Sequence, residues 1–229
     1  MELSKRLKAV ACLVTPGNRM ADVGTDHGYI PIYLIKEKKV SHAIAMDVNR
    51  GPLLRAQEHI REEALEEQIE TRLSDGMEKL RPGEVDTVVI AGMGGALTLR
   101  ILENGSKVAE GLKELILQPQ SELGKVRRWL TEHGYCIADE DMVLEDGKYY
   151  PMMRAVRGDM EPLREIDALY GPVLLRKKHP CLKEYLCWEK GVRRNVLEQL
   201  KNAGEGAQSR RAEVEEALKL NARAQEELG

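Results

Sequence analysis

Short apolar runs alternate with longer amphipathic segments from Arg19 to Arg157, and this alternation limits the folds open to the chain more than any other feature. The runs are typical of buried strands, whereas the longer segments carry apolar residues at helical spacing. Strands interleaved with helices favour a mostly parallel sheet with helices on both faces. The sequence therefore predicts an α/β fold with a Rossmann-like sheet. We expect strands near Met20–Val23, His42–Asp47, Ile69–Leu73, Thr87–Ala91 and Leu115–Leu117, and helices near Ile30–Lys38, Pro52–Glu66, Ala96–Ala109 and Glu122–His133.

Two further apolar runs, Ile137–Leu144 and Tyr149–Val156, are separated by a short polar segment. That segment contains Asp146-Gly147, and Asp-Gly is a strong signal for a tight turn between antiparallel strands. We therefore expect an antiparallel pair of strands to close the sheet.

The composition changes after Gly158. Residues 159–229 contain few strand-like runs and many Glu, Lys, Arg, Ala and Leu residues at helical spacing. Two apolar stripes consist of Leu182, Tyr185, Leu186, Val192, Val196 and Leu200, and of Val214, Ala217, Leu218, Ala224 and Leu228, with Gly204-Glu205-Gly206 between them. These stripes predict an antiparallel helical hairpin. We therefore divide the chain into a domain of residues 1–158 and a helical domain of residues 159–229.

The overall charge and hydropathy exclude some classes of protein. The chain carries 35 Lys and Arg residues against 38 Asp and Glu residues, a formal net charge of −3, so any basic face for nucleic acid must be local. No apolar run is long enough to span a membrane, and basic residues interrupt the apolar residues of segment 1–14. We expect a cytoplasmic protein with no membrane contact.

The four cysteines, Cys12, Cys136, Cys181 and Cys187, are scattered and form no C-x-x-C pair. This spacing is not typical of a disulfide framework or of a structural zinc site, which needs four ligands at recognisable spacing. We therefore expect reduced thiols and no metal.

Four polar or glycine-rich segments follow the predicted strands. They are Asp22-Val23-Gly24, Asp47, Ser74-Asp75-Gly76 and Ala91-Gly92-Met93-Gly94-Gly95. Each has a structural explanation as a turn or a helix cap when taken alone. Together they lie in the order that a ribonucleoside requires: a close backbone approach, a carboxylate for the ribose hydroxyls, an acceptor for the purine amine and a loop for the planar ring. The sequence therefore predicts a nucleotide site.

The residues of the first loop favour one kind of nucleotide. A dinucleotide site needs G-x-G-x-x-G, but Asp26 occupies a glycine position here, and its carboxylate would repel a pyrophosphate. S-adenosylmethionine carries a sulfonium and an ammonium group, and the carboxylates of Asp22 and Asp26 would attract both. We therefore expect S-adenosylmethionine rather than NAD.

Several motifs together resemble a known family. They are Ala21-Asp22-Val23-Gly24-Thr25-Asp26-His27-Gly28-Tyr29-Ile30-Pro31, Ala91-Gly92-Met93-Gly94-Gly95, Gln118-Pro119-Gln120 and Asp146-Gly147-Lys148-Tyr149-Tyr150-Pro151. In this combination the chain closely resembles the bacterial tRNA (adenine-22-N1)-methyltransferase family along about its whole length. The resemblance implies a class I methyltransferase domain followed by a coiled-coil-like helical domain. It also implies transfer of a methyl group from S-adenosylmethionine to N1 of adenine 22 in the tRNA D-arm.

The resemblance also suggests which residues bind the methyl donor. By position, Gly24, Asp47, Asp75, Gly76 and Gly92 fall on donor-binding motifs of class I enzymes. Asp22, Thr25, His27, Ala91 and Met93 lie in the same loops and complete the predicted donor site.

We expect positioning to dominate catalysis. The Asn/Asp-Pro-Pro-Tyr/Phe loop of many enzymes that methylate exocyclic amines is replaced by Ala91-Gly92-Met93-Gly94. Adenine N1 has an in-plane lone pair, so it attacks a methyl group without first losing a proton. The methylated ring is cationic, and Asp26 is our candidate for stabilising that charge or accepting a later N6 proton. Alternatively, Asp26 caps the helix or orders the loop.

The predicted substrate contacts lie in both domains. Tyr29 is expected to stack on the target base or to pack on the sheet, and Tyr149 to contact the substrate or to pack across the hairpin. Gln118 and Gln120 are expected to recognise adenine edges or to satisfy backbone groups near Pro119. The predicted tRNA backbone contacts are Arg176, Lys177, Lys178, Lys183, Arg193 and Arg194. Lys5, Arg6, Lys8 and Arg19 form another basic candidate set.

Two other functions remain open on the residues alone. One is a class I methyltransferase that acts on another RNA base or on a small molecule. The other is a non-catalytic nucleotide-binding module whose helical hairpin contacts a partner protein. The sequence leaves the oligomeric state open, with a monomer favoured.

Overall fold

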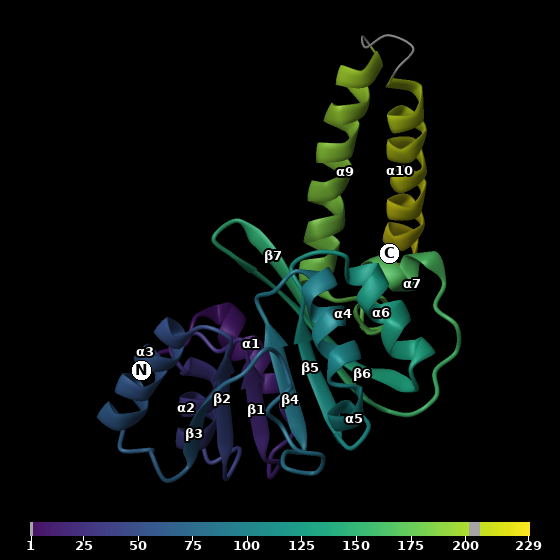
Figure 1. Cartoon of the computed structure of the whole chain (residues 1–229). Helices are drawn as coiled ribbons and strands as arrows, with labels where there is room; N and C mark the ends of the chain where they lie inside the picture. The colour runs from purple at the N-terminus through teal and green to yellow at the C-terminus, as the bar shows by residue number, and fades with distance from the viewer. Residues whose placement is uncertain (1, 202–206) are drawn as a thin grey trace. The chain divides into compact units, whose positions relative to one another are not determined.

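The computed structural model describes residues 2–201 and 207–229. The chain divides into two compact units, Met1–Glu161 and Pro162–Gly229. The first unit contains a mixed sheet with helices on both faces, and the second is helical (Figure 1). The assignment of separate functions to residues 1–158 and 159–229 stays a prediction.

The seven strands of the first unit form one sheet with the order β3-β2-β1-β4-β5-β7-β6. Their bounds are β1 Met20–Val23, β2 Ala43–Asp47, β3 Ile69–Leu73, β4 Thr87–Ala91, β5 Glu114–Gln118, β6 Tyr135–Glu145 and β7 Lys148–Arg157. Strands β1 to β5 are parallel, and β7 pairs antiparallel with both β5 and β6. The predicted α/β fold and its closing antiparallel pair are confirmed.

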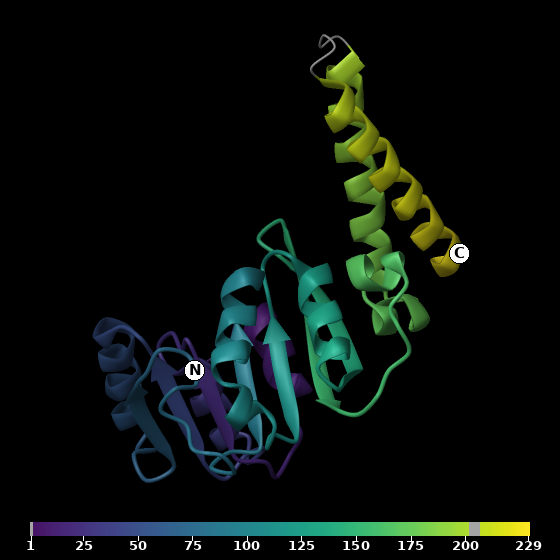
Figure 2. The same cartoon turned by 45° about the vertical axis from the view of Figure 1, so that its right-hand side comes forward.

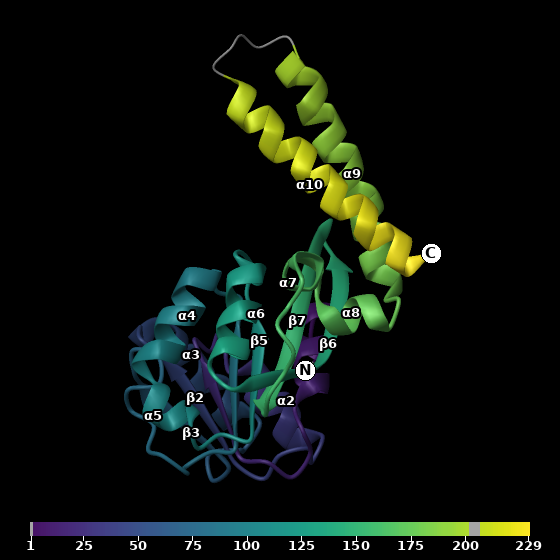
Figure 3. The ribbon, with the colours of Figure 1, turned by 90° about the vertical axis from the view of Figure 1, so that its right-hand side faces the viewer.

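Helices cover both faces of this sheet. On one face lie α1 Lys5–Leu13, α2 Tyr29–Lys36 and α3 Arg50–Glu62, whose apolar side chains share one buried cluster with strand residues Met20 and Val89. On the other face lie α4 Gly95–Asn104, α5 Ser106–Ala109 and α6 Leu123–Glu132, with α4 and α6 side by side (Figure 3). The burial of both faces explains why the central strands have almost uninterrupted apolar sequences.

Two elements differ from the sequence-based prediction. Helix α1 was not predicted, because its buried face is short, although Ser4 caps it by accepting a hydrogen bond from the Leu7 amide at 3.3 Å. The single helix predicted at Ala96–Ala109 is in fact the pair α4 and α5, separated at Gly105. A Cβ atom on Gly105 would lie 2.9 Å from Met77 Cβ, so Met77 or the Gly105 backbone would have to shift to admit a side chain there.

The second unit contains α7 Glu165–Tyr170, α8 Pro172–Arg176, α9 Pro180–Lys201 and α10 Gln208–Leu228. Helices α9 and α10 lie side by side (Figure 2), and Asn221 of α10 donates a hydrogen bond to the Leu186 carbonyl of α9 at 3.0 Å. The helical pairing agrees with the predicted hairpin. The turn predicted at Gly204-Glu205-Gly206 lies outside the described residues.

The interface between α9 and α10 differs from the predicted apolar stripes. Val192 was placed in a stripe but is exposed, and the buried positions include Glu189 and Asn221. Glu189 accepts hydrogen bonds at 2.8 to 3.1 Å from Tyr170, Tyr185, Arg193 and Asn221. The buried charge is tolerated because several donors surround it. The interface between α9 and α10 therefore contains a polar network around Glu189 as well as apolar contacts.

Within residues 2–201 and 207–229, no helix has the length and apolar character needed to cross a membrane. The same residues contain no group of three or more His, Cys, Asp or Glu side chains arranged to hold a metal ion. Among the described residues, Cys12, Cys136, Cys181 and Cys187 form no disulfide, and Cys12 and Cys187 are exposed.

Candidate active site at the carboxyl edge of the sheet

The strand order reverses between β1 and β4, because the chain extends from β1 towards β3 on one side and from β4 towards β5 on the other. In open α/β sheets the crevice at such a switch point holds the ligand. The segment Gly24–His27 follows β1, Asp47 ends β2, Asp75-Gly76 follows β3, and Gly92-Met93 follows β4. The structure therefore brings all four predicted donor-binding segments to one edge of the sheet.

Four of the polar or small residues at this edge point to the same face. Asp22 is in register with Ala45 of β2 and Val89 of β4, and neighbouring residues in register share a face. Side chains alternate along a strand, so Asp47 and Ala91, each two residues further along, also lie on this face. Gln118 is in register with Ala91. The row Asp47, Asp22, Ala91 and Gln118 thus crosses the switch point.

Asp22 is a buried carboxyl group, with 5% of the residue exposed. Burial raises the pKa of Asp22 to about 6; the Thr25 hydroxyl opposes this shift, and the negative charges of Asp47 and Asp26 add to it. The raised pKa means that the ionised carboxylate is poorly solvated. A cationic group placed beside Asp22 would relieve this cost.

Gly24 shapes the first loop. Its φ of +79° lies in the left-handed region, and a Cβ atom there would lie 1.9 Å from Met93 Cε. The amides of Gly24 and Thr25 both donate to the Met46 carbonyl at 2.8 Å. These two amides are therefore engaged within the sheet, and what the loop offers a ligand is a close approach of its backbone.

Asp26 does not cap the following helix, contrary to one of its two predicted roles. Helix α2 has Gly28 as its N-cap, without a side-chain hydrogen bond. The Asp26 side chain is 72% exposed, and its carboxylate lies 3.4 Å from both Arg55 Nη2 and His27 Nε2. An exposed carboxylate in this loop is compatible with stabilising a cation. The loop-ordering role, through Arg55, also remains open.

Three stacked rings form the outer part of the loop. His27, Tyr29 and His59 have ring centroids 5.0 to 5.4 Å apart and planes within 20° of parallel. His59 Nδ1 also lies 3.0 Å from the His27 carbonyl oxygen. His59 was not predicted, because it lies on α3 and meets the loop only through the fold. The stack holds the Tyr29 ring, whose contact with a target base stays a prediction.

The two remaining acidic residues of the donor site lie at turns. Asp47 accepts a hydrogen bond from the Asn49 amide at 2.6 Å, so its carboxylate is held at the end of β2. Asp75 is exposed after β3, in a turn that buried Ser74 braces by donating to the Gly76 carbonyl at 3.0 Å. These turns therefore fix the backbone of both aspartates at the same end of the sheet as the Asp22 loop.

Gln118 and Gln120, which were predicted to contact the target adenine, have different surroundings. Gln118 is fully buried and accepts a hydrogen bond from Arg6 Nη1 at 3.0 Å, whereas Gln120 is exposed. The Arg6 guanidinium lies 5.4 Å from the centre of the Tyr150 ring. Tyr149 is half-buried and in register with Leu144 of the hairpin. Arg6 was predicted only as a member of a basic set, and its contact with Gln118 was missed.

The basic residues of the second unit are mostly exposed. Exposed members are Arg176, Lys177, Lys178, Lys183 and Arg194. Arg193 differs, because its guanidinium donates to Glu189 at 2.8 Å and only 34% of its side chain is exposed. We expect Arg193 to contribute less to RNA binding than Arg194 does.

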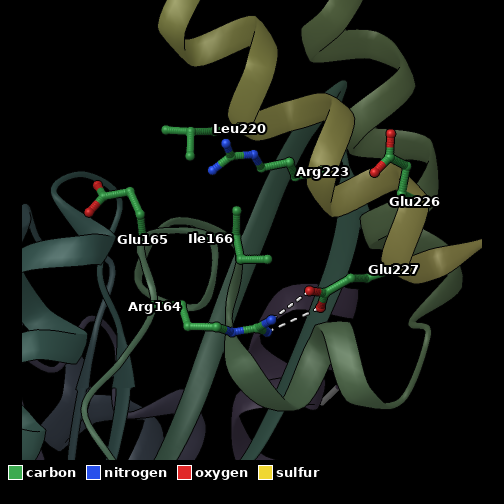
Figure 4. Close-up of a pocket in the computed structure, with 7 residues that line it drawn as sticks. All are labelled: Arg164, Glu165, Ile166, Leu220, Arg223, Glu226 and Glu227. Carbon is green, nitrogen blue, oxygen red and sulfur yellow. Dashed lines mark hydrogen bonds and ion pairs between the residues drawn. The ribbon is translucent and has the colours of Figure 1, made fainter.

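A hollow in the second unit has a different character (Figure 4). It is lined by Arg164, Glu165, Ile166, Leu220, Arg223, Glu226 and Glu227. Arg164 donates to both carboxylate oxygens of Glu227, at 2.6 and 3.1 Å, and also to Asp167. Because acidic side chains outnumber arginines here and Arg164 is already paired with Glu227, this hollow does not suit a phosphate.

The comparisons with known proteins agree with the geometry at the sheet edge. A family described as "Methyltransferase domain" matches residues 3–153. The tRNA (adenine(22)-N(1))-methyltransferase of Bacillus subtilis is 36% identical over 215 residues, which cover 92% of this chain and 90% of that protein.

Two solved structures are similar along almost the whole chain. The crystal structure of the B. subtilis M1A22 tRNA methyltransferase TrmK has a TM-score of 0.86 and 34% identity, covering 98% of this chain and 99% of that one. The Streptococcus pneumoniae protein Sp1610 in complex with S-adenosyl-L-methionine has a TM-score of 0.86 and 32% identity, covering 98% and 100%. The chain belongs to the bacterial tRNA (adenine(22)-N(1))-methyltransferase family.

Proposed function

We propose that this protein transfers a methyl group from S-adenosylmethionine to N1 of adenine 22 in the D-arm of tRNA. The observation that carries the proposal is the buried Asp22 carboxyl group at the switch point, with Asp47 on the same face of the sheet. This arrangement suits a positively charged nucleoside and disfavours a pyrophosphate. Family membership supplies the nucleotide and the ring position.

The residues at the sheet edge fit the methyl donor. S-adenosylmethionine supplies a methyl group on a positively charged sulfonium. Asp22 and Asp26 would hold its cationic groups, Asp47 its ribose hydroxyls and Asp75 its purine amine. The left-handed Gly24 allows the backbone to approach the donor closely. Thr25, His27, Gly76, Ala91, Gly92 and Met93 complete the proposed donor site.

The chemistry at adenine requires placement more than acid or base catalysis. Adenine N1 has a free lone pair, so the protein needs to extrude the base, exclude water and align N1 with the methyl group. As positive charge develops on the ring, the Asp26 carboxylate stabilises it through the N6 amine. Tyr29, Gln118, Gln120 and Tyr149 are the proposed contacts of the base.

The second unit is proposed to bind the tRNA backbone. Its exposed lysine and arginine side chains offer charge for phosphates, although the whole chain carries a net charge of −3. Arg176, Lys177, Lys178, Lys183 and Arg194 carry this role, with a smaller share for Arg193. We favour a monomer, because every residue of the proposed donor site lies within the first unit.

The test measures transfer of labelled methyl groups to an unmodified tRNA transcript. We expect stoichiometric labelling of the transcript and loss of labelling when adenine 22 is replaced by guanine. Labelling that persists on the substituted transcript would indicate another target base. Binding of S-adenosylmethionine without transfer to tRNA would indicate a small-molecule methyltransferase or a binding module.

A further inference from the structure

Helix α1 brings Arg6 to the carboxyl ends of β5 and the β6–β7 hairpin. Its guanidinium donates to Gln118 Oε1 at 3.0 Å and lies 5.4 Å from the centre of the Tyr150 ring. The Arg6 backbone amide donates to Glu145 Oε1 at 3.2 Å. Three contacts therefore hold Arg6 in one place, at the acceptor side of the sheet edge.

The contact with Arg6 fixes the orientation of the Gln118 amide. An arginine side chain has only donors, so the amide must turn its oxygen towards Arg6. The Nε2 group, which carries two N–H donors, must then face the other way. Gln118 is fully buried, and its Nε2 has no hydrogen-bond acceptor among the described residues. An unpaired buried donor is costly, and most buried polar groups have partners.

The unpaired Nε2 group of Gln118 lies on the side of the crevice where we place the methyl acceptor. Gln118 shares a sheet face with Asp22 and Asp47, but it stands on the opposite side of the switch point. The proposed contacts of the methyl donor lie at β1 to β3 and in the loop after β4, which leaves the end of β5 for the methyl acceptor. Gly92 adjoins the cluster, since a Cβ atom there would lie 3.6 Å from Arg6 Nη1.

The target adenine can accept a hydrogen bond from an N–H group at this place. Adenine must keep N1 free of hydrogen bonds in order to attack, but its N3 and N7 atoms are acceptors that remain available. A buried N–H group aimed at one of these ring nitrogens would fix the base in its plane. It would not compete for the reacting lone pair.

We propose that Arg6 is a positioning residue for methyl transfer, which orients the Gln118 amide so that Nε2 donates to a ring nitrogen of the extruded adenine. The inference rests on the proposed function and adds a specificity contact to it. Arg6 acts through Gln118 and does not touch the reacting atoms. Gln118 touches the base.

The decisive variant is Gln118→Glu. A glutamate keeps the size of the side chain and still accepts from Arg6, now as an ion pair, but it has no Nε2 donor. We expect kcat at saturating tRNA to fall by about tenfold or more, the effect of losing one hydrogen bond at the acceptor. The Kd for S-adenosylmethionine should change by less than about threefold, and the melting temperature should not fall. Wild-type kcat in this variant would overturn the inference.

Arg6 is tested by Arg6→Met and Arg6→Lys. We expect Arg6→Met to lower kcat in the same direction and Arg6→Lys to restore part of it, since lysine still donates to Oε1. Because Arg6 acts only through Gln118, adding Arg6→Met to Gln118→Glu should lower kcat by no more than about a further twofold. Fully additive losses would overturn the inference.

The matched control is Lys107→Met, which removes one exposed positive charge from α5. We expect its kcat and KM to equal those of the wild type. If Arg6→Met raises only the KM for tRNA, and salt abolishes the difference, Arg6 contacts a phosphate and the inference is wrong.

The wild type is assayed in parallel. If it transfers no methyl group to tRNA, the proposed function and the inference both fail; if it is active and Gln118→Glu equals it, only the inference fails.

Discussion

At the scale of single residues, the ionised Asp22 carboxylate lowers the stability of the folded state but suits the binding of a cation. Its folded pKa of about 6 lies above the ordinary aspartate value near 3.8, mainly because the group is buried. The ionised carboxylate therefore destabilises the folded state, and this cost is fully present above about pH 6 and disappears as the pH falls towards 4. The cost amounts to about 3 kcal/mol, from about 1.4 kcal/mol for each unit of pKa shift. The proposed binding of a cation beside Asp22 would offset this cost.

The first prediction concerns Asp22→Asn. We expect this variant to be more stable than the wild type at pH 8, by on the order of 2 kcal/mol, and to show no such gain near pH 4. Its affinity for S-adenosylmethionine should fall by at least about tenfold, because the cationic groups lose their carboxylate. Thermal unfolding and titration calorimetry at both pH values measure these effects. Lower stability at pH 8, or unchanged donor affinity, would contradict this account of Asp22.

The second prediction concerns Asp26→Ala. We expect single-turnover methylation of tRNA to slow by about tenfold to a hundredfold, with donor affinity changed only a few-fold, because we propose that the carboxylate stabilises charge on the methylated ring. Arg55→Met is the matched control: it removes the Asp26 partner at 3.4 Å but keeps the carboxylate. Equal losses in the two variants would show that Asp26 only orders the loop through Arg55.

At the scale of elements, Glu189 joins three helices of the second unit. It lies on α9 and accepts hydrogen bonds from Tyr170 of α7 and Asn221 of α10, as well as from its own helix. Burial works to raise the pKa of Glu189, but hydrogen bonds from Arg193, Asn221 and Tyr170 outweigh burial and lower it. The charged form therefore stabilises the folded state, and this contribution is lost as the pH falls below the ordinary glutamate value.

The third prediction concerns Glu189→Ala. We expect the second unit to lose about 3 kcal/mol of stability, because several buried donors lose their shared acceptor. Glu189→Gln should cost less, since the amide oxygen still accepts. The exposed Glu216→Ala on α10 breaks only a surface ion pair with Lys219 and should change stability by less than about 0.5 kcal/mol. Thermal unfolding at pH 7 ranks the three variants. A Glu189→Ala protein as stable as Glu216→Ala would contradict the role of this network.

The sequence predicted those elements whose signals are local. The strands and the Asp146-Gly147 turn were found because apolar runs and turn residues occupy consecutive positions. Helix α1 and the break at Gly105 were missed, since one depends on a short buried face and the other on contact with Met77. Glu189 and Asn221 interrupt the predicted stripes, because a buried polar network has no periodic signature in the sequence.

The same distinction applies to the candidate site. The placement of Asp22, Asp47 and Asp75 at one edge could be predicted, because each lies at or after the end of a parallel strand. The partners that fix the site come from distant segments: Arg6 reaches Gln118 from α1, and His59 reaches the first loop from α3. Only the tertiary fold determines these contacts. Sequence reasoning therefore predicted which segments meet at the candidate site and missed the contacts that orient its side chains.

At the scale of the whole molecule, an acidic protein is proposed to bind a polyanion. The net charge of −3 means that long-range attraction to tRNA must come from local basic residues rather than from the chain as a whole. Binding should therefore depend on a few exposed side chains and weaken steeply with salt.

The fourth prediction tests these side chains with the double variant Lys183→Glu, Arg194→Glu. We expect tRNA affinity to fall by at least about tenfold. The slope of log affinity against log salt should become shallower by about 0.7 to 0.9 for each phosphate that the variant no longer neutralises. Binding of S-adenosylmethionine should be unchanged. Lys219→Glu makes a charge reversal of the same kind on α10 and serves as the control. Equal losses in the control would indicate a general charge effect instead of a specific surface.

The most direct test of the whole account maps the methyl group on the RNA. An unmodified tRNA transcript is incubated with the protein and S-adenosylmethionine, and the product is examined by reverse transcription and by mass spectrometry of its nucleosides. A methyl group on N1 blocks the pairing edge of adenine, so the account predicts 1-methyladenosine and a single arrest of the reverse transcriptase next to position 22. Methylation at another nucleotide, or N6-methyladenosine without arrest, would contradict it.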